Sequence, residues 1–482
     1  MQGAKHIHLI GICGTAMASL AGMLQAQGHR VTGSDAAAYP PMSDVLAALG
    51  IAVREPYAAA NLEPWPDLVI VGNAISRGNV ELEHLLDVRI PFTSMAAVLH
   101  DEFLAGRESL VVAGTHGKTT TTSMLAWIYK VASRTQPEFA PSFLIGGVAE
   151  NFGTSFMVRP LENDGVRRPF LIEGDEYDTA FFDKGPKFLH YFPDAAILTH
   201  VEFDHADIYP DLAAVKTAFK RLVNLVPRRG RVVAFDGSEN VTECVAKAFC
   251  AVERYGFRPN SHWRIAAMRH EDGVTHWTLV RGGETFAELR LPLAGEHNAL
   301  NATAAAALAA GQGVPVAAIM EALATFRSVK RRLEVRAEVG GVTIIDDFAH
   351  HPTAIRETLR ALRSSYSGRR LWAVLEPRSN TLRRNVFEEA LVESLALADK
   401  VVLAAVFKSE AIPAAERLHP ENVVAALEAR GVEARVYADA DAIVGALAPR
   451  LEAGDVVAIL SNGGFGGIYT KLPEAIGAMV TA

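Results

Sequence analysis

Short apolar runs alternate along the chain with stretches that carry apolar residues at helical spacing. An apolar run that ends in glycine or polar residues and leads into an amphipathic stretch is typical of a βαβ unit, in which helices join parallel strands. The pattern predicts strands over residues 6–10, 30–34, 68–71, 110–113, 170–172, 196–198, 342–345, 371–375, 401–405 and 456–460. It predicts helices over residues 17–27, 121–131 and the alanine-rich residues 299–310. We therefore expect an α/β protein built on parallel sheets.

These elements group into three tandem α/β domains, which we place at residues 1–106, 107–326 and 327–482. The length of 482 residues agrees with three domains of roughly 150 residues each. Within the second domain, residues 134–169 are loop-rich and are interpreted as an insertion.

The composition excludes several classes of function. Lys and Arg total 47 against 55 Asp and Glu, a net charge of −8, and the chain lacks the basic stripe that nucleic acid requires. The most apolar stretch, residues 299–310, falls short of the roughly 20 residues that span a bilayer, so we expect no membrane partner. The three cysteines, Cys13, Cys244 and Cys250, are too few for a disulfide framework or a closed zinc site. With no leader pattern at the N-terminus, we expect a cytoplasmic protein. Nothing in the sequence specifies an oligomeric state.

The strongest chemical signal is a glycine-rich loop that follows the strand predicted at residues 110–113. It reads Gly114-Thr115-His116-Gly117-Lys118-Thr119-Thr120 and leads into a predicted helix. This order of elements wraps backbone N–H groups around phosphates at the positive end of a helix. Lys118 would neutralise the β- and γ-phosphates of a nucleotide, and the Thr119 hydroxyl would bind Mg²⁺. The general pattern has glycine where this chain has Val112, so the alternative is a turn that only happens to contain Gly-Lys-Thr.

Polar side chains also follow the next two predicted strands. Residues 173–178 carry four carboxylates: Glu173, Asp175, Glu176 and Asp178. Their oxygens suit a hard cation such as Mg²⁺, although a solvated acidic loop has the same composition. Residues 199–207 include Asp204 and His205, and a histidine in this setting acts as a metal ligand, as a base or as a structural residue. Because the carboxyl ends of parallel strands meet at one edge of a sheet, we expect these groups to converge.

Two further motifs lie at the starts of helices. Asn298 and Asn301 are three positions apart, so both amides lie on one helical face, where they would bind a ligand or cap the helix. Asp347 follows a predicted strand and precedes His350, His351 and a proline, and capping is again the alternative to a functional role. Adjacent histidines do not face one metal ion, which argues against a zinc site here.

The first predicted strand ends in Gly11-Ile12-Cys13-Gly14-Thr15, and Asp35 follows the second strand. This arrangement resembles a dinucleotide-binding turn, but Cys13 stands where the second glycine of that fingerprint is required. A nicotinamide cofactor is therefore disfavoured. We expect instead a nucleotide diphosphate at the N-terminus of the first helix.

Taken in order, these motifs resemble those of the Mur ligase family of peptidoglycan synthesis over nearly the whole chain. The motifs that carry the resemblance are residues 114–120, 173–178, Asp204-His205, Asn298 with Asn301, Arg331-Arg332 and residues 347–352. The family's phosphate loop also lacks the first general glycine, so Val112 agrees with the resemblance. It implies a Rossmann-like N-terminal domain for UDP, a central ATPase-type domain with a phosphate loop, and a Rossmann-like C-terminal domain.

The resemblance also implies an activity, ATP-driven amide synthesis through an acyl phosphate, with Mg²⁺ as the metal ion. It implies Thr119, Glu173 and His205 as metal ligands and Lys118, Arg332 and Asp347 as further catalytic residues, the last two closing over the nucleotide. The implied contacts to ATP are Gly114, Thr115, His116, Gly117, Lys118, Thr119, Thr120, Asn298 and Asn301. The implied contacts to the UDP-sugar are Gly11, Ile12, Cys13, Gly14, Thr15 and Asp35.

Two branches of the family act on UDP-N-acetylmuramate, and one adds L-alanine whereas the other adds the recycled murein tripeptide L-alanyl-γ-D-glutamyl-meso-diaminopimelate. The chain looks more like the tripeptide-adding branch in three segments: residues 10–15, residues 33–35 with 39–43, and residues 376–381. Alanine addition and a nucleotide-sugar sensor that binds without catalysis are the alternatives. Several family members carry a carbamylated lysine beyond the metal histidine, and Lys216 and Lys220 are both near that spacing.

Overall fold

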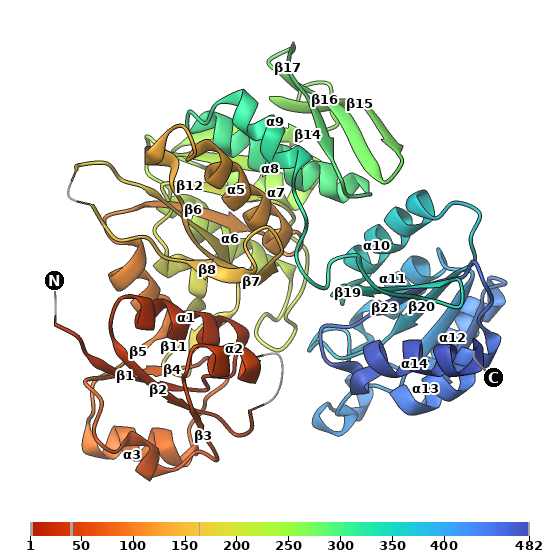
Figure 1. Cartoon of the computed structure of the whole chain (residues 1–482), viewed down its shortest axis with the longest axis horizontal. Coiled ribbons are helices and arrows are strands. Elements are labelled where there is room, and N and C mark those ends of the chain that lie inside the picture. Colours follow the sequence, from red (N-terminus) through yellow and green to blue (C-terminus); the bar gives the residue numbers. More distant parts are fainter. Residues whose placement is uncertain (1–2, 39–41, 163, 481–482) are drawn as a thin grey trace.

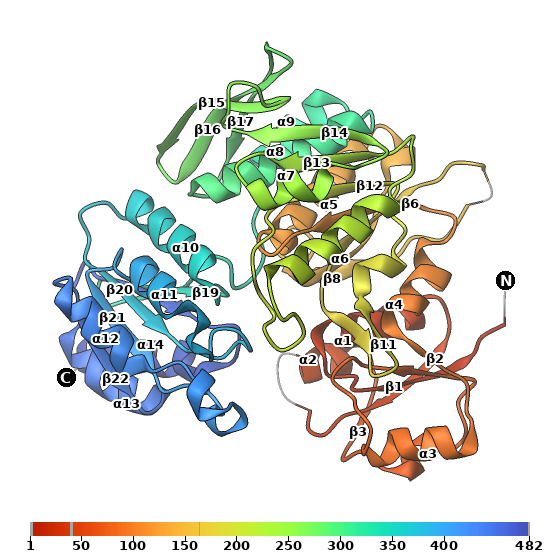
Figure 2. The same ribbon diagram turned by 180° about the vertical axis from the view of Figure 1, so that it is seen from behind.

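The computed structural model describes residues 3–38, 42–162 and 164–480, which fold into three α/β domains in chain order. The N-terminal and C-terminal domains both lie against the central domain (Figures 1 and 2). The prediction of three α/β domains is confirmed. Of the segments that look like the tripeptide-adding branch, residues 39–41 lie outside the described residues.

The N-terminal domain is a parallel five-stranded sheet in the order β3-β2-β1-β4-β5. Its strands are β1 (His6–Ile10), β2 (Arg30–Ser34), β3 (Val53–Arg54), β4 (Leu68–Val71) and β5 (Phe92–Ser94). Its helices are α1 (Thr15–Ala26), α2 (Met42–Ala48), α3 (Val80–Val88) and α4 (Met95–Val98). The bounds of β1, β2 and β4 are those that the apolar pattern predicts.

The central domain contains a ten-stranded sheet in the order β17-β16-β15-β14-β13-β12-β6-β9-β7-β8. Its strands are β6 (Glu108–Ala113), β7 (Ser142–Ala149), β8 (Thr154–Met157), β9 (Pro169–Gly174), β12 (Ala195–Leu198), β13 (Arg231–Phe235), β14 (Ala251–Gly256), β15 (Trp263–Glu271), β16 (Val274–Arg281) and β17 (Glu284–Leu291). A separate hairpin is formed by β10 (Asp178–Ala180) and β11 (Asp183–Pro186). The helices are α5 (Lys118–Ala132), α6 (Leu212–Leu225), α7 (Glu239–Val245), α8 (Glu296–Gly311) and α9 (Val316–Ala324).

Helices cover both faces of this sheet. The core on one face contains residues of α5, α8 and α9, and the core on the other contains residues of α6 and α7. Helix α8 is apolar on nearly every side because it is buried from Asn298 to Ala309. Within the described residues, no helix is both long enough and apolar enough to cross a membrane.

The interpretation of residues 134–169 as a loop-rich insertion is wrong. Strand β7 pairs in parallel with β9, and β8 pairs antiparallel with β7, so this segment forms one end of the central sheet. Helix α1 of the N-terminal domain packs against both of these strands. The hydroxyl oxygens of Ser19 and Ser155 lie 2.8 Å apart in this buried contact. A glycine-rich strand whose outer side is covered by another domain lacks the polar–apolar alternation that marks a strand.

The C-terminal domain is a six-stranded sheet in the order β18-β19-β23-β20-β21-β22, in which only β18 is antiparallel to its neighbour. Its strands are β18 (Glu334–Val339), β19 (Val342–Asp347), β20 (Leu371–Leu375), β21 (Lys400–Ala404), β22 (Glu433–Tyr437) and β23 (Val456–Leu460). Its helices are α10 (Pro352–Ser365), α11 (Glu388–Leu395), α12 (Pro420–Ala429), α13 (Ala440–Leu447) and α14 (Ile468–Val480). Two cores cover the two faces of this sheet.

The segment that leads into this domain has an unusual backbone. Ser328, Arg331 and Leu333 have φ angles of 81°, 63° and 51°, in the left-handed region that residues other than glycine rarely adopt. Three such residues within six positions store strain at the crossing between the central and C-terminal domains.

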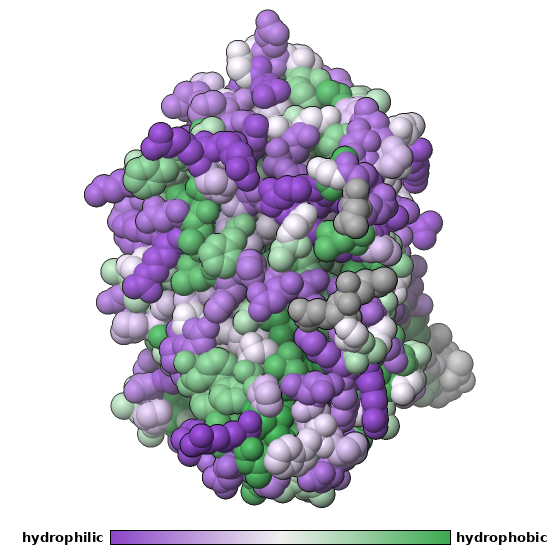
Figure 3. Space-filling view, turned by 90° about the vertical axis from the view of Figure 1, so that its left-hand side faces the viewer, coloured by the Kyte–Doolittle hydropathy of each residue, from purple (hydrophilic) through white to green (hydrophobic). Residues whose placement is uncertain are grey.

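The outer surface of the N-terminal and central domains mixes polar and apolar side chains (Figure 3). Apolar residues are more frequent toward the lower part of this face, where the N-terminal domain lies.

Gly22 of α1 tests the contact between the first two domains. A Cβ atom at Gly22 would lie 2.5 Å from the ring of Phe156 on β8. Because overpacking costs about 1–3 kcal/mol, we expect Gly22→Ala to lower the unfolding midpoint measured by calorimetry.

Gly445 in helix α13 is the matched control, because a Cβ atom there would meet nothing within 4 Å. Gly445→Ala should leave the midpoint unchanged or raise it, since alanine favours a helix by about 0.8–1 kcal/mol over glycine. Equal stabilisation by both variants would show that the close approach of α1 and β8 is not a constraint.

Candidate functional site

The phosphate loop, residues 114–120, lies between β6 and the first turn of α5. Gly114 has a φ of 138°, and a Cβ atom there would lie 2.1 Å from the Thr199 hydroxyl oxygen. Gly117 has a φ of 81°, and its Cβ atom would lie 2.6 Å from Asn301 Oδ1. Only glycine fits these two positions, which leaves backbone N–H groups accessible at the N-terminus of α5.

Lys118 is held at the centre of the loop by two hydrogen bonds. Its ammonium group donates to the Gly114 carbonyl oxygen at 2.8 Å and to Glu176 Oε2 at 2.8 Å, and it lies 4.0 Å from Asp175 Oδ1. Burial alone would lower the pKa of Lys118, but the charges of Glu176 and Asp175 raise it above its usual value. The ammonium group is therefore charged, and the two hydrogen bonds fix its position.

Glu173 lies at the carboxyl end of β9, where its carboxylate is hydrogen-bonded to Thr119. The Thr119 hydroxyl donates to Glu173 Oε2 at 3.0 Å, and the Gly146 amide donates to Glu173 Oε1 at 2.5 Å. Burial and the nearby charge of Asp175 raise the pKa of Glu173 to about 7. A buried carboxylate with this property is stabilised by a cation beside it.

His205 forms a second group close to the first. Its Nε2 atom lies 3.1 Å from Glu176 Oε1, and its ring centroid lies 4.0 Å from that of Tyr177. Burial opposes protonation, but the hydrogen bond and charge of Glu176 raise the pKa of His205 above 6.5. His205 also has a φ of 56°, a strained conformation that is common at functional sites.

The three predicted metal ligands therefore fall into two neighbouring groups, Thr119 with Glu173 and His205 with Glu176. Glu176 connects the two groups. One of its oxygens lies beside His205, and the other accepts a hydrogen bond from Lys118, the residue before Thr119. Burial would raise the pKa of Glu176, yet Lys118 and His205 lower it to about 2. Glu176 was one of four carboxylates in its motif, and spacing alone did not distinguish its role.

A cavity of about 440 Å³ lies between the central and C-terminal domains, within the range of small-molecule sites. Seven of the predicted nucleotide-site residues line it: His116, Gly117, Thr120, Asn298, Asn301, Arg332 and Asp347. Lining residues at the end of β13 and in the segments that follow β13 and β14 were not predicted, among them Phe235, Ser238, Asn240 and Phe257. Recognition of β13 and β14 in the sequence could have located these residues, because side chains at the ends of parallel strands meet at one edge of the sheet.

The lining residues differ in how free their polar groups are. Asn298 donates its amide to the carbonyl of Ala294, just before the start of α8, at 2.7 Å, whereas Asn301 Oδ1 faces Gly117 of the phosphate loop. Asp347 accepts hydrogen bonds from the amides of Leu333 and Ala349 and from the Thr358 hydroxyl.

Arg332 lies with its guanidinium carbon 5.2 Å from the centroid of the Phe348 ring and lines the cavity. Asp347 thus fixes the backbone around Arg332, since one of its bonds is to the next residue, Leu333.

The loop of residues 199–207, which follows β12, contacts the C-terminal domain. Glu202 Oε2 lies 2.9 Å from His116 Nε2 and accepts from the Thr353 hydroxyl at 2.7 Å. In the described part of the chain, one group of three metal-ligand types comes together, His116, Glu202 and His351, with ligand atoms within 4.8 Å of one another. His351 caps α10, because its Nδ1 accepts from the Thr353 amide. These hydrogen bonds account for the cluster without a metal ion.

The glycine turn of the N-terminal domain joins β1 to α1. The amides of Gly11 and Ile12 donate to the Ser34 carbonyl oxygen, and the Cys13 amide donates to Asp35 Oδ2 at 2.8 Å. Helix α1 begins at Thr15 with no acidic residue in its first turn, so its N-terminus suits an anion. Burial and the charge of Asp35 raise the pKa of the Cys13 thiol to about 11, which makes it unreactive.

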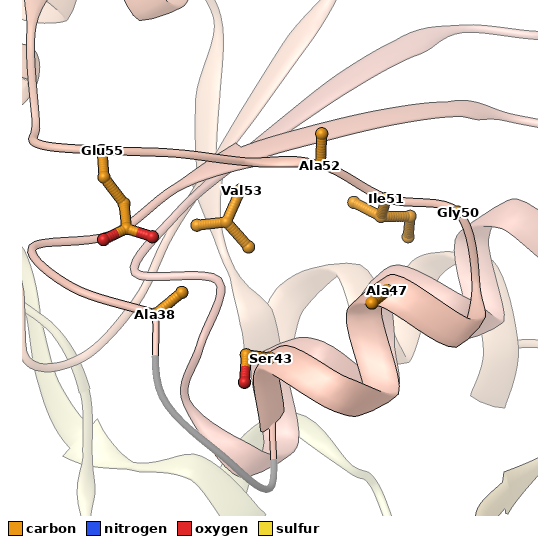
Figure 4. A pocket seen from close by; sticks show the side chains of 8 residues that line it. All are labelled: Ala38, Ser43, Ala47, Gly50, Ile51, Ala52, Val53 and Glu55. Atoms are coloured by element: carbon orange, nitrogen blue, oxygen red, sulfur yellow. The ribbon is translucent and has the colours of Figure 1, made fainter.

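A hollow of about 420 Å³ lies in the N-terminal domain between α2 and β3 (Figure 4). Its walls are mostly apolar, from Ala47, Ile51 and Val53, and Glu55 is the charged side chain that lines it. A negative charge does not suit a phosphate, so this hollow is no alternative to the glycine turn.

Lys216 and Lys220, the two lysines near the spacing of the carbamylated residue, both form ion pairs. The amino groups of Lys216 and Lys220 lie 2.6 Å and 2.7 Å from the carboxylate of Glu243 on α7. Their positive charges are thus used in ion pairs.

Comparison with known proteins follows the same division of the chain. The model of the Mur ligase family catalytic domain matches residues 6–106, that of the Mur ligase middle domain matches residues 112–309, and that of the Mur ligase glutamate ligase domain matches residues 331–463.

Individual relatives match over nearly the whole length. The chain is 43% identical over 472 residues to the UDP-N-acetylmuramate–L-alanyl-gamma-D-glutamyl-meso-2,6-diaminoheptandioate ligase of Escherichia coli K12, covering 98% of each. It is 33% identical over 477 residues to the UDP-N-acetylmuramate–L-alanine ligase of Burkholderia thailandensis, also covering 98% of each. The crystal structure of a murein peptide ligase from Psychrobacter arcticus superposes with a TM-score of 0.74 at 36% identity, covering 98% of this chain and 99% of that one. This chain therefore belongs to the Mur ligase family.

Proposed function

We propose that this protein is an ATP-dependent ligase that joins L-alanyl-γ-D-glutamyl-meso-diaminopimelate to the lactyl carboxylate of UDP-N-acetylmuramate in murein recycling. The observation that carries the proposal is the clustering of a phosphate loop, paired carboxylates and a histidine beside a cavity between two domains. The 43% identity to the Escherichia coli tripeptide ligase, against 33% to an alanine ligase, supports the choice of the tripeptide.

The chemistry has two steps. The carboxylate attacks the γ-phosphorus of ATP, ADP leaves, and an acyl phosphate forms. The amine of the tripeptide then attacks the acyl carbon, and inorganic phosphate and a proton leave as the amide forms. Phosphoryl transfer depends on positioning and charge neutralisation, which the fixed ammonium group of Lys118 and the amides at the start of α5 supply.

The residues beside the phosphate loop fit a magnesium ion. Thr119 and Glu173 offer oxygen atoms 3.0 Å apart, and burial of Glu173 leaves its carboxylate in need of positive charge. Thr119 and Glu173 would hold the ion, with His205 as a further ligand. When bound, Mg²⁺ would neutralise charge on the transferred phosphoryl group.

The other predicted residues have roles that follow from their contacts. Asn301 and Arg332 would contact ATP in the cavity, and Asn298 would shape the start of α8. Asp347 would position the backbone next to Arg332 through its bond to the Leu333 amide. The glycine turn of residues 11–15, whose first three amides donate to Ser34 and Asp35, would hold the UDP group at the N-terminus of α1. The use of ATP and the three free cysteines support a cytoplasmic location.

The choice of amine is tested by phosphate release. With ATP, Mg²⁺ and UDP-N-acetylmuramate present, we expect kcat/KM for the tripeptide to exceed that for free L-alanine by at least about a hundredfold, because a site built for the longer peptide uses its distal contacts in the transition state. The opposite preference would assign the protein to alanine addition. Binding of UDP-N-acetylmuramate without phosphate release with either amine would indicate a sensor.

Lys118→Ala should lower kcat by about 10²–10³-fold, the range found for loss of one preorganised charge-stabilising group. Binding of UDP-N-acetylmuramate, measured by calorimetry, should persist because the glycine turn lies in a different domain. Lys184→Ala is the matched control, since Lys184 pairs with Asp178 at the surface and is 68% exposed. Activity of Lys118→Ala at the control's level would remove the phosphate loop from the mechanism.

Glu176→Gln should lower kcat by about tenfold to a hundredfold, because Glu176 orients both Lys118 and His205. The thermal unfolding midpoint should also fall, since the variant leaves a buried ammonium group without its nearest counter-charge. Glu162→Gln removes a comparable contact to Arg168 at an exposed site and should change neither quantity. Full activity of Glu176→Gln would show that these two side chains are oriented by other contacts.

A further inference from the structure

The 199–207 loop lies between the central domain and the C-terminal domain, and two threonine hydroxyls of the C-terminal domain bind it. Thr353 lies in the first turn of α10, and Thr381 lies in the segment that follows β20. Both hydroxyls donate to carboxylates of the loop, Thr353 to Glu202 and Thr381 to Asp204. Each carboxylate also binds a group of the nucleotide site.

The first contact reaches the phosphate loop. Glu202 Oε2 accepts from Thr353 at 2.7 Å and lies 2.9 Å from Nε2 of His116. The Glu202 amide donates to the Thr115 hydroxyl oxygen at 2.9 Å. Glu202 therefore connects two adjacent residues of the phosphate loop to the first turn of α10.

The second contact reaches the metal-ligand candidate His205. Asp204 Oδ1 accepts from the Thr381 hydroxyl at 2.6 Å and from the His205 amide at 2.7 Å. The strained φ of 56° at His205 is thus held by the carboxylate that Thr381 binds. Asn380 adds a bond of 2.8 Å to Asp207 on the other side of His205.

The contact between Thr381 and Asp204 is shielded from water, whereas the Glu202 side chain beside Thr353 is 30% exposed. Thr381 is 2% exposed and Asp204 is 6% exposed. Hydrogen bonds to charged acceptors are stronger than those between neutral groups, and their strength increases further where water is excluded. Both bonds require the C-terminal domain to lie in the position that the structure shows, because their donors and acceptors belong to different domains.

We propose that Thr353 and Thr381 are positioning residues, which hold the phosphate loop and His205 in their reactive arrangement only when the C-terminal domain has docked. The inference rests on the proposed ligase function for its kinetic consequence. Thr381 acts through Asp204 on His205, and Thr353 acts through Glu202 on His116. Phosphoryl transfer is thereby coupled to the arrival of the domain that completes the cavity.

The first experiment compares Thr381→Val with Thr381→Ser. Valine keeps the volume and removes the hydroxyl, so kcat should fall by about tenfold or more while the KM for UDP-N-acetylmuramate stays unchanged. The Mg²⁺ concentration for half-maximal rate should rise, because His205 is less well held. Serine restores the hydroxyl and should return kcat to within about twofold of the wild type. Equal losses in both variants would assign the effect to packing and overturn the proposal.

A double-mutant cycle tests the route through Asp204. If Thr381 acts by holding Asp204, then Thr381→Val should cause little further loss of kcat in an Asp204→Asn background. Multiplicative losses would show that the two residues act separately and would refute the coupling. Thr353→Val, which should raise the KM for ATP more than it changes the response to Mg²⁺, supplies an independent variant if Thr381→Val folds poorly.

Thr343→Val is the matched control. Thr343 is a buried threonine of the same domain, its hydroxyl accepts a hydrogen bond from Arg369, and it lies near the start of β19, at the opposite edge of the sheet. It should leave kcat and the response to Mg²⁺ unchanged. A loss equal to that of Thr381→Val would attribute both effects to general destabilisation of the domain.

Amide hydrogen exchange gives a readout that does not depend on the reaction. In the full-length protein without substrates, Thr381→Val should accelerate exchange in peptides covering residues 199–207 by about fivefold, and Thr381→Ser should not. Unchanged exchange would overturn the positioning role even if the ligase activity is confirmed. If exchange accelerates but the wild type has no activity toward the tripeptide, the proposed function is refuted and the positioning contact still stands.

Discussion

A buried ion pair between Lys118 and Glu176 organises the candidate active site. Two charges removed from water are stable only if their geometry is good and their remaining hydrogen bonds are satisfied. Here the second oxygen of Glu176 binds His205, and the ammonium group of Lys118 also binds the carbonyl of Gly114. The ends of β6, β9 and β12 are therefore connected at one point. A charged group whose position is fixed in this way is the kind of preorganised group that stabilises developing charge in phosphoryl transfer.

Much of the fold followed from local pattern, and the exceptions have physical causes. Strands such as β1, β20 and β23 were predicted at their observed bounds because they are buried on both faces and end in distinctive turns. The segment that forms β7 and β8 was misinterpreted, because its outer side is covered by helix α1 of another domain and so lacks a polar face. Strands β13 to β17 were not predicted, and the lining residues that follow β13 and β14 were missed with them.

The same limit applies to the site. Glycines, a lysine and carboxylates at strand ends identify a phosphate site, since the chemistry requires those residue types in that order. Which of several carboxylates faces which cation depends on side-chain direction, so Glu176 was not distinguished from its neighbours. The contacts of Glu202 with Thr353 and of Asp204 with Thr381 were not predicted, because the two partners of each belong to different domains and are distant in sequence. For His351 the sequence argued against a zinc site and left capping as the alternative to a functional role; the side chain does cap α10 and also lies beside Glu202.

The cavity between the central and C-terminal domains takes its walls from both, and this has a consequence for the free protein. A ligand that touches both walls has greater affinity for the docked arrangement than for a separated one, and it shifts the population toward docking by the ratio of those affinities. The strained backbone at Ser328, Arg331 and Leu333 lies in the connection that such a movement would bend. If ATP binds in this cavity as proposed, it is an effector of the conformation as well as a reactant. An inhibitor that filled the cavity without a transferable phosphoryl group would trap the protein in its docked form.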